Sequence, residues 1–513
     1  MAVKLFASIL IGSTETELKI YELSPRREIR CVDCVSRRID LGVDAYACGT
    51  LSTEKVNLLT ETLREYRQIM EGYHVSAHRC VATSALREIR TALITKDYLE
   101  KQTGLTMTIL SNSEQRLLDY KSIASRSASF EKIIQNGTMI VDIGGSSLQI
   151  SVFDKDKLFT TQNIRVGKIT AREKFYPLAR NNEHFEALLA ELMDHELAGF
   201  GKLYQKDRQI VTLIATNREL QQLFSSHVQR KGSDVITTAE FMETYRRIVY
   251  LNPDEIMSQY SVSSDSAKFI VPSAIICRCL LERFGAEKIW LPEVSIGDGV
   301  CYEYAISSKL LRARHSFDED IIAASRNIAK RYKSSNAHIK NVEELSLTMF
   351  DRLKKVHGLG QRERLLLQIS AILHNCGKYI SLADVADCAY NIIMATEIIG
   401  LSHAERQIVA NVVKFNTTDF VYYEELALTS SVTREEYLVI AKLTAILRAA
   451  NSLDRGHRQK IKEVDVTVQG GEVLLGVRTN EDLTLEKGAL EDKDALFEEV
   501  FNLHPVIRQK KSL

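Results

Sequence analysis

The chain has 513 residues, and its 67 lysines and arginines balance its 67 aspartates and glutamates, so the formal net charge is zero. A neutral balance argues against a general nucleic-acid-binding coat, although it leaves room for a local basic cleft. No segment approaches the roughly 20 apolar residues that a membrane-spanning helix needs. Nine scattered cysteines are typical of reduced thiols. We therefore expect a cytoplasmic protein without nucleic-acid or membrane partners.

The first 306 residues contain the same strand–turn–strand pattern twice. ILIGSTETELKIYEL (9–23) and IVDIGGSSLQISVF (140–153) each place a small-residue turn between two apolar strands, and helical segments follow at 54–70 and 183–197. The duplication predicts two related α/β domains, residues 1–130 and 131–306, whose Gly/Ser turns face each other across a cleft. Phosphate groups bind well between such turns.

From residue 307 the pattern changes to successive helices. Apolar residues recur at helical spacing, for example Leu345, Met349, Leu353 and Val356, which predicts an all-α domain over residues 307–460. The remaining residues, 461–513, predict a small α+β segment with a hairpin turn at Gly470-Gly471.

The loop from Asp142 to Ser147, with the sequence DIGGSS, carries the clearest chemical signal. Its glycines allow backbone N–H groups to approach an anion, and its serine hydroxyls add donors. Asp142 stands at a strand end, where a carboxylate can hold a metal ion or a water molecule beside a phosphate. The next polar position on that face, where a second acid is expected, is Gln149.

These motifs resemble the exopolyphosphatase / guanosine pentaphosphate phosphohydrolase (Ppx/GppA) family. The resemblance rests on GST at 12–14, ATSALRE at 82–88, DIGGSS at 142–147, GLSHAERQIV from 400 and LTAILRAANSLDR from 443. It implies an α/β fold with two actin-like, ribonuclease-H-like domains of the sugar kinase and actin ATPase superfamily. An all-α HD-like domain and a small α+β C-terminal segment follow, and a homodimer is implied.

The family's chemistry is attack of water on a terminal phosphate of polyphosphate or guanosine pentaphosphate, with Mg²⁺ as the cation. The resemblance implies that Asp142 is the metal ligand. It also implies a set of phosphate-binding residues, namely Gly12, Ser13, Thr14, Arg87, Gly144, Gly145, Ser146 and Ser147.

The family's acids are replaced by uncharged residues. The acid that ends the family's first strand falls on Leu10, the general base falls on Gln115, and the acid after the second loop falls on Gln149. Glutamine keeps the size of glutamate but cannot accept a proton from water near neutral pH. Glu114 could replace the base only if the turn shifts its register. Gln115, Gln149 and Glu114 are therefore the candidate catalytic positions.

The helical domain shows similar replacements. An HD-type metal site needs a His-Asp pair and further ligands, but this chain has His374-Asn375, and the positions expected for later ligands fall on Cys388, Asn416 and Asn451. No metal is therefore expected there.

Three functions remain open. The first is a sensor that binds polyphosphate or a guanosine polyphosphate with weakened or lost hydrolysis and without a required cofactor. The second is an active Mg²⁺-dependent hydrolase that uses Glu114 as its base. The third is a dimerisation scaffold with a vestigial cleft. The Gly/Ser turns would contact only the phosphate groups of the ligand, so the sequence does not distinguish polyphosphate from a guanosine polyphosphate.

Overall fold

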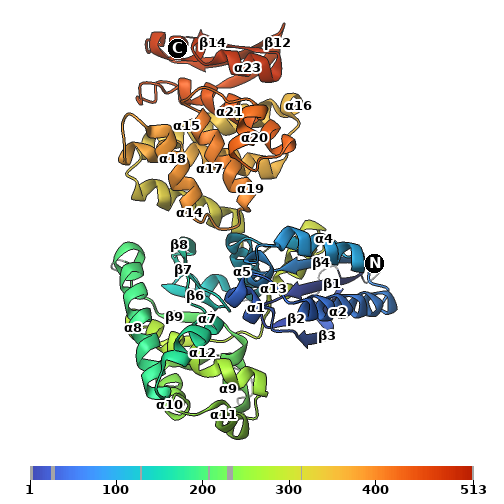
Figure 1. The fold of residues 1–513 in the computed structure, drawn as a ribbon. Helices are drawn as coiled ribbons and strands as arrows, with labels where there is room; N and C mark the ends of the chain where they lie inside the picture. Colours follow the sequence, from blue (N-terminus) through green and yellow to red (C-terminus); the bar gives the residue numbers. More distant parts are fainter. Residues whose placement is uncertain are drawn as a thin grey trace. The chain divides into compact units, whose positions relative to one another are not determined.

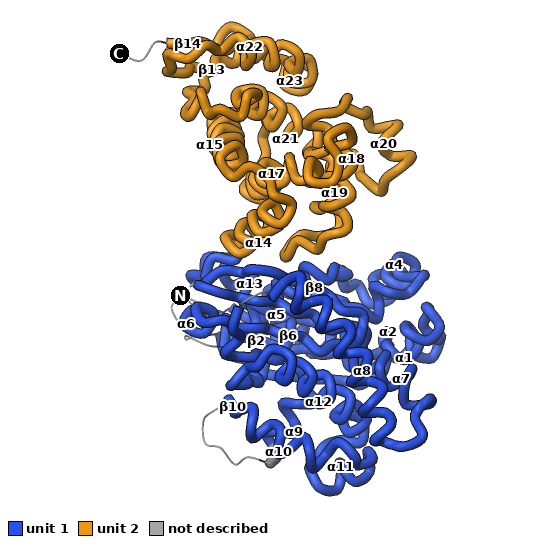
Figure 2. The backbone as a smooth tube through the Cα atoms, turned by 90° about the vertical axis from the view of Figure 1, so that its left-hand side faces the viewer, with its two compact units in different colours: residues 1–317 blue, residues 318–513 orange. Residues whose placement is uncertain are grey.

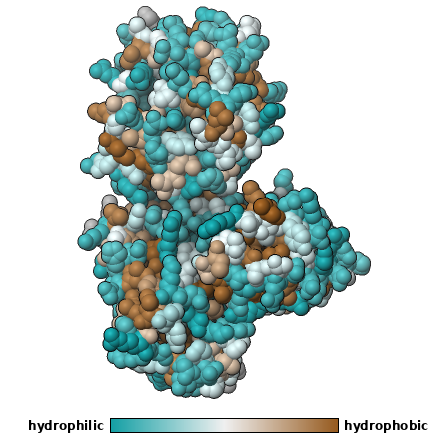
Figure 3. Space-filling model, viewed as in Figure 1, coloured by the Kyte–Doolittle hydropathy of each residue, from teal (hydrophilic) through white to brown (hydrophobic). Residues whose placement is uncertain are grey.

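The structure of the protein is a computed structural model that describes residues 4–24, 29–126, 130–205, 208–227, 235–313 and 315–510. The chain forms two compact units, Met1–Phe317 and Asp318–Leu513 (Figure 2). The finer predicted divisions at residues 130 and 460 remain predictions. Hydrophilic side chains dominate the face shown in Figure 3. Among the described helices, none is long and apolar enough to cross a membrane.

The first sheet of unit 1 has the strand order β3-β2-β1-β4-β5. β1 and β2 are antiparallel, as are β2 and β3, whereas β4 and β5 extend the sheet in parallel. Ile9 and Ile11 of β1 pack on one face and Phe6 packs on the other, so both faces are covered. The strands are β1 (Lys4–Ile11), β2 (Glu15–Leu23), β3 (Arg30–Arg38), β4 (Ala77–Ala82) and β5 (Met107–Ile109).

Helices cover both faces of this sheet (Figure 1). They are α1 (Leu41–Cys48), α2 (Thr53–Gly72), α3 (Ser84–Arg87), α4 (Ala92–Thr103), α5 (Asn112–Arg126) and, from much later in the chain, α13 (Ile296–Ser307). α5 and α13 pack so closely that a Cβ atom added at Gly299 would lie 2.1 Å from the Leu118 carbonyl oxygen. Gly299 therefore sets how near α5 lies to α13.

The second sheet repeats the first. Its order is β10-β11-β9-β6-β7-β8; β6 pairs antiparallel with β7 and parallel with β9, as β1 does with β2 and β4. The predicted duplication is thus confirmed. The strands are β6 (Thr138–Ile143), β7 (Leu148–Asp154), β8 (Lys157–Ile164), β9 (Thr212–Thr216), β10 (Val235–Thr237) and β11 (Lys288–Trp290).

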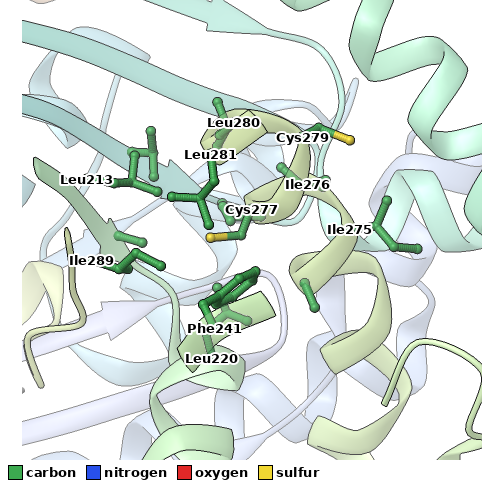
Figure 4. Packing of buried hydrophobic residues seen from close by; sticks show 14 of the residues in the cluster. Leu213, Leu220, Phe241, Ile275, Ile276, Cys277, Cys279, Leu280, Leu281 and Ile289 are labelled. Atoms are coloured by element: carbon green, nitrogen blue, oxygen red, sulfur yellow. The ribbon is translucent and has the colours of Figure 1, made fainter. Parts of the chain in front are cut away.

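α12 forms the centre of the core around this second sheet. Cys277 and Leu281 of α12 lie near Leu213 and Ile289 of the sheet, with Phe241 beneath them (Figure 4). Cys277 is fully buried and acts as a small apolar side chain. The helices here are α6 (Phe130–Ile133), α7 (Lys168–Phe175), α8 (Asn182–Phe200), α9 (Arg218–His227), α10 (Thr238–Ile248), α11 (Pro253–Tyr260) and α12 (Ser264–Phe284), with short turns at Tyr176–Leu178 and Gly201–Gln205.

Unit 2 is helical, as the periodicity predicts. The segment from Leu345 to Val356 belongs to two helices, because the backbone leaves helical geometry at Leu353 (ψ 13°). The helices are α14 (Phe317–Arg331), α15 (Asn336–Arg352), α16 (Lys354–His357), α17 (Gln361–Leu373), α18 (Val385–Ala395), α19 (His403–Phe415), α20 (Tyr423–Thr429) and α21 (Arg434–Ser452), with a short turn at Cys376–Tyr379.

The C-terminal segment contains the predicted hairpin. β12 (Asp465–Gln469) and β13 (Glu472–Arg478) are joined by Gly470 and Gly471, whose φ values of 62° and 80° require glycine. β14 (His504–Lys510) adds in parallel to β13, and α22 (Thr484–Glu491) and α23 (Asp494–Phe501) lie between these two strands in sequence.

A buried histidine cluster lies inside unit 2. Nδ1 of His338 is 2.8 Å from Oδ2 of Asp454, and Nε2 of His338 is 3.0 Å from Nε2 of His374. The His457 ring stacks on His338 with centroids 3.5 Å apart. Asp454, three residues beyond Asn451, is therefore the acid that contacts His338. The assignment of a family ligand position to Asn451 stays a prediction.

We expect this cluster to make the protein acid-labile. Burial lowers the pKa of His374 from 6.5 to about 3 and that of His457 to about 4. A histidine with a lowered pKa contributes stability that is complete above pH 6.5 and is lost as the pH falls through the folded-state value. His374→Gln should flatten the fall in unfolding free energy on acidification, measured by urea titration at several pH values. His195→Gln, on the exposed side of α8, should leave the fall unchanged.

Candidate active site

A pocket of about 370 Å³ lies where the turns of the two sheets meet. We call it the inter-sheet pocket. The Gly12–Thr14 turn of the first sheet and Gly144 and Gly145 of the second line it, together with α5, α7 and the start of α9. A Cβ atom added at Gly145 would lie 3.0 Å from Oγ of Ser13, so the two turns approach each other closely at this glycine. The predicted facing of the turns is confirmed.

Backbone hydrogen bonds hold both turns in shape. The Gly12 N–H donates to the Glu15 carbonyl at 2.9 Å, and the Gly144 N–H donates to the Ser147 carbonyl at 3.0 Å. The first N–H groups of α7, at Lys168 and Ile169, donate to the carbonyls of Gly144 and Gly145. The second turn is thus fixed to the N-terminus of α7, whose first N–H groups are used in this contact.

α5 presents two side chains, one helical turn apart, to the pocket. Nε2 of Gln115 donates to Oδ2 of Asp142 at 3.1 Å, which joins the first α/β half to the second. Asp119 follows four residues later and is only 5% exposed. Its Oδ2 atom is buried and accepts no hydrogen bond from the residues that the structure describes. Sequence reasoning missed Asp119, although its spacing from Gln115 places both on one helix face.

Both aspartates have a raised proton affinity. Burial raises the pKa of Asp142 to about 6, although nearby Lys168 and the Gln115 hydrogen bond act in the opposite direction. Burial, and then the charge of Asp142, raises the pKa of Asp119 well above its usual value. Near neutral pH this pair therefore favours either a bound proton or a bound cation.

The charges around the inter-sheet pocket do not balance. Its described lining has five carboxylates and three cations, and each cation pairs with a carboxylate: Lys168 with Glu219 at 2.5 Å, Arg38 with Asp265 at 3.5 Å, and Arg218 with Glu15. Asp119 and Asp142 remain as the excess negative charge. A phosphate chain entering this pocket meets two acids, so a cation must accompany it.

These residues fit Mg²⁺, which proteins often bind with one or two carboxylates plus phosphate oxygens of the substrate. Asp142, the predicted ligand, and Asp119 would supply the carboxylates. Within the described residues, no group of three or more His, Cys, Asp or Glu side chains could hold a metal without such help. The site therefore suits a cation that arrives with its phosphate ligand.

Two predicted catalytic residues lie away from the pocket lining. The Glu114 carboxylate accepts the backbone N–H of Ser111 at 2.9 Å, as the N-terminal cap of α5. Gln149 is 3% exposed, and its Oε1 accepts Nε–H of the buried Arg116 at 3.2 Å. Gln115 is thus the only one of the three candidates that reaches the pocket, among the residues described.

The predicted phosphate-binding residues divide between two cavities. Gly12, Ser13, Thr14, Gly144 and Gly145 line the inter-sheet pocket. Ser146, Ser147 and Arg87 line a second cavity of about 640 Å³. Arg87 donates to the Leu110 carbonyl at 2.6 Å and to Oε1 of Gln115 at 3.4 Å. A single loop, residues 144–147, therefore contributes to both cavities.

Family models and known proteins are similar to this chain over most of its length. Residues 20–308 match the model of the Ppx/GppA phosphatase family, and residues 322–499 match the model of Ppx/GppA phosphatase domain III. A guanosine-5'-triphosphate,3'-diphosphate pyrophosphatase of Photobacterium profundum is 19% identical over 447 residues, which is 86% of each chain. Exopolyphosphatase 2 of Mycobacterium tuberculosis is 22% identical over 329 residues, covering 60% of this chain and 100% of that protein.

Solved structures confirm the fold. The Ppx/GppA family member of Aquifex aeolicus superposes with a TM-score of 0.52 at 18% identity, over 61% of this chain and 100% of that one. An exopolyphosphatase of Cytophaga hutchinsonii gives a TM-score of 0.53 at 16% identity, over 60% of this chain and 100% of that one. The expected actin-like α/β fold with a helical C-terminal region is confirmed. The chain belongs to the Ppx/GppA phosphatase family.

Proposed function

We propose that the protein binds the phosphate end of polyphosphate or of a guanosine polyphosphate in the inter-sheet pocket, together with Mg²⁺, and hydrolyses it slowly if at all. The observation that carries this proposal is the Gln115–Asp142 hydrogen bond on the pocket wall. The phosphate-binding turns surround a position where an amide stands in place of the expected base. Family membership and the names of the relatives support the ligand class.

Binding and bond cleavage depend on different groups. Backbone N–H groups of the turns, the Ser13 hydroxyl and the cation provide affinity for phosphate oxygens. Cleavage needs in addition a group that takes a proton from the attacking water, and the amide of Gln115 cannot do so. Mg²⁺, when bound, would neutralise phosphate charge, while Asp142 and Asp119 would hold it in place.

A second candidate function is hydrolysis with Asp119 as the base. The observation in its favour is that Oδ2 of Asp119 is buried in the pocket and accepts no hydrogen bond from the described residues, and that burial raises the pKa of this carboxyl. Asp119 fits this role better than Glu114, whose carboxylate caps α5. If phosphate release is measurable, Asp119→Asn should abolish it and Glu114→Gln should not.

The remaining expectations extend the proposal to the whole chain. We propose a cytoplasmic homodimer in which the helical unit, with an HD-like arrangement of its helices, responds to ligand binding. A buried His–His–Asp contact set in that unit supports the HD-like comparison.

The test is a thermal-shift titration with tripolyphosphate and with guanosine pentaphosphate, each with and without Mg²⁺. A ligand present at 100 times its dissociation constant stabilises the folded state by about 2.7 kcal/mol. We expect Mg²⁺ to enlarge the shift, and we expect this Mg²⁺-dependent part to be lost in Asp119→Asn. Asp97→Asn, an exposed acid on α4, is the control. A shift without a Mg²⁺-dependent part for either ligand would overturn the proposal, and no shift at all would favour the scaffold.

The pH dependence of this shift has a defined sign. Without a cation, the raised pKa of Asp142 means that its contribution to stability is complete below 3.8 and is lost as the pH rises through about 6. Mg²⁺ binds the ionised carboxylates. The Mg²⁺-dependent stabilisation should therefore be larger above pH 6 than below it.

A further inference from the structure

The second cavity differs from the inter-sheet pocket in charge. The loop 144–147 lines both, with Ser146 and Ser147 on the side of the second cavity. Arg87, Arg90, Arg165 and Lys174 line it, and Glu88 is the single acid in its described lining. We call it the basic pocket. Its cations come from separate parts of the chain: the segment around α3, the residue after β8, and α7. A protein with no net charge has thus concentrated four cations around one cavity of about 640 Å³.

Three of these cations stand without a counter-ion from the described part of the chain. Arg90, Arg165 and Lys174 form no ion pair with any residue that the structure describes. The single acid, Glu88, accepts the hydroxyl of Ser146, another lining residue, at 2.7 Å, and it leaves the four cations in excess. In the inter-sheet pocket, by contrast, every lining cation is paired and two acids are in excess. The basic pocket therefore attracts a polyanion without help from a metal ion.

A hydrogen-bonded wall separates the two cavities. The Tyr46 hydroxyl, in the basic pocket, lies 2.8 Å from Oγ of Ser13 and 2.7 Å from Oγ of Ser84, both in the inter-sheet pocket. Burial raises the pKa of Tyr46, so the hydroxyl stays protonated and able to donate. The two cavities are thus adjacent but distinct, with the loop 144–147 and this wall between them.

We infer that the basic pocket is a second binding site for phosphate chains, one that needs no metal ion. The groups that recognise the ligand are the guanidinium groups of Arg90 and Arg165 and the ammonium group of Lys174, with the Ser147 side of the loop beside them. The phosphates come either from the distal part of a chain whose end occupies the inter-sheet pocket or from a separate polyanion. The inference deepens the proposed function and rests on it for the ligand class.

The decisive experiment measures tripolyphosphate binding by calorimetry in the presence of EDTA. Wild-type protein should bind, and the double variant Arg90→Ala/Arg165→Ala should bind at least about tenfold more weakly, because two charge-assisted phosphate contacts are removed. Arg165→Glu alone should give a similar loss. The control is Arg246→Ala/Arg247→Ala, which removes two exposed arginines of α10 that line neither pocket. Metal-free binding that is absent, or unchanged in both basic-pocket variants, would overturn the inference.

The same variants distinguish the two sources of phosphate. If one phosphate chain spans both sites, the double variant should weaken the binding of long-chain polyphosphate far more than that of tripolyphosphate when Mg²⁺ is present. If the basic pocket binds a separate polyanion, long-chain polyphosphate and tripolyphosphate should lose the same metal-independent part of their binding. Either result supports the site. Failure of the proposed function would look different, because Mg²⁺-dependent binding sensitive to Asp119→Asn would then be missing whatever happens at Arg90 and Arg165.

Discussion

Gln115→Glu is expected to raise the rate of Mg²⁺-dependent phosphate release from polyphosphate by about 10²–10⁴-fold, the usual contribution of a general base. Of the three catalytic positions predicted from the sequence, position 115 is the one on the pocket wall, with its side chain 3.1 Å from Asp142. A glutamate there would face Asp142 directly. Two carboxylates at that distance share a proton, which leaves one able to accept a proton from water near neutral pH.

Two controls sharpen this experiment. Glu114→Gln, at the preceding residue, should leave the rate unchanged, because its carboxylate caps α5 outside the pocket lining. Gln149→Glu should add little, since the new carboxylate would pair with the buried guanidinium of Arg116. A wild-type protein that already turns over at an ordinary enzymatic rate, with Gln115→Glu giving no gain, would show that Gln115 does not mark a lost base.

Gly299→Ala is expected to lower the free energy of unfolding by about 3 kcal/mol, at the upper end of overpacking penalties. The added methyl group would lie 2.1 Å from the Leu118 carbonyl oxygen and 2.9 Å from its carbonyl carbon. Backbone atoms cannot move aside as a flexible side chain does, so α5 must shift away from α13. Because α5 carries Gln115 and Asp119, the Mg²⁺-dependent binding of tripolyphosphate should weaken as well.

Urea unfolding of Gly299→Ala and Gly199→Ala tests this packing argument. Gly199 lies near the end of α8 with no atom within 4 Å of an added Cβ, so alanine there should be neutral or stabilising by up to about 1 kcal/mol. Equal effects of the two substitutions would mean that helix propensity, and not the α5–α13 contact, determines the result.

The strands and turns could be predicted because their signals are local. The alternation in β1 and β2, the DIGGSS turn and the Gly470-Gly471 hairpin each specify a conformation within a few residues. The pocket lining could not be read in the same way. Glu114 and Gln115 are neighbours about 100° apart on a helix, and only the packing of α5 against α13 decides that Gln115 faces the pocket.

Asp119 was missed for a related reason. It lies within a helix and carries no motif of its own, so its role depends on a partner, Asp142, that is distant in sequence. The division of the loop 144–147 between two cavities is likewise a property of the tertiary structure. Arg165 and Lys174 meet Arg87 and Arg90 only after both α/β halves have folded.

The two half-exposed ion pairs that join the α/β halves bear on how long a ligand stays bound. Arg218 with Glu15 and Arg38 with Asp265 connect the first half of unit 1 to the second across the inter-sheet pocket. Exposed pairs of this kind are screened by salt, whereas the buried Gln115–Asp142 contact is not. Residence time of a phosphate ligand should therefore shorten with ionic strength through faster opening of the halves, even where the contacts to the phosphates themselves are unchanged.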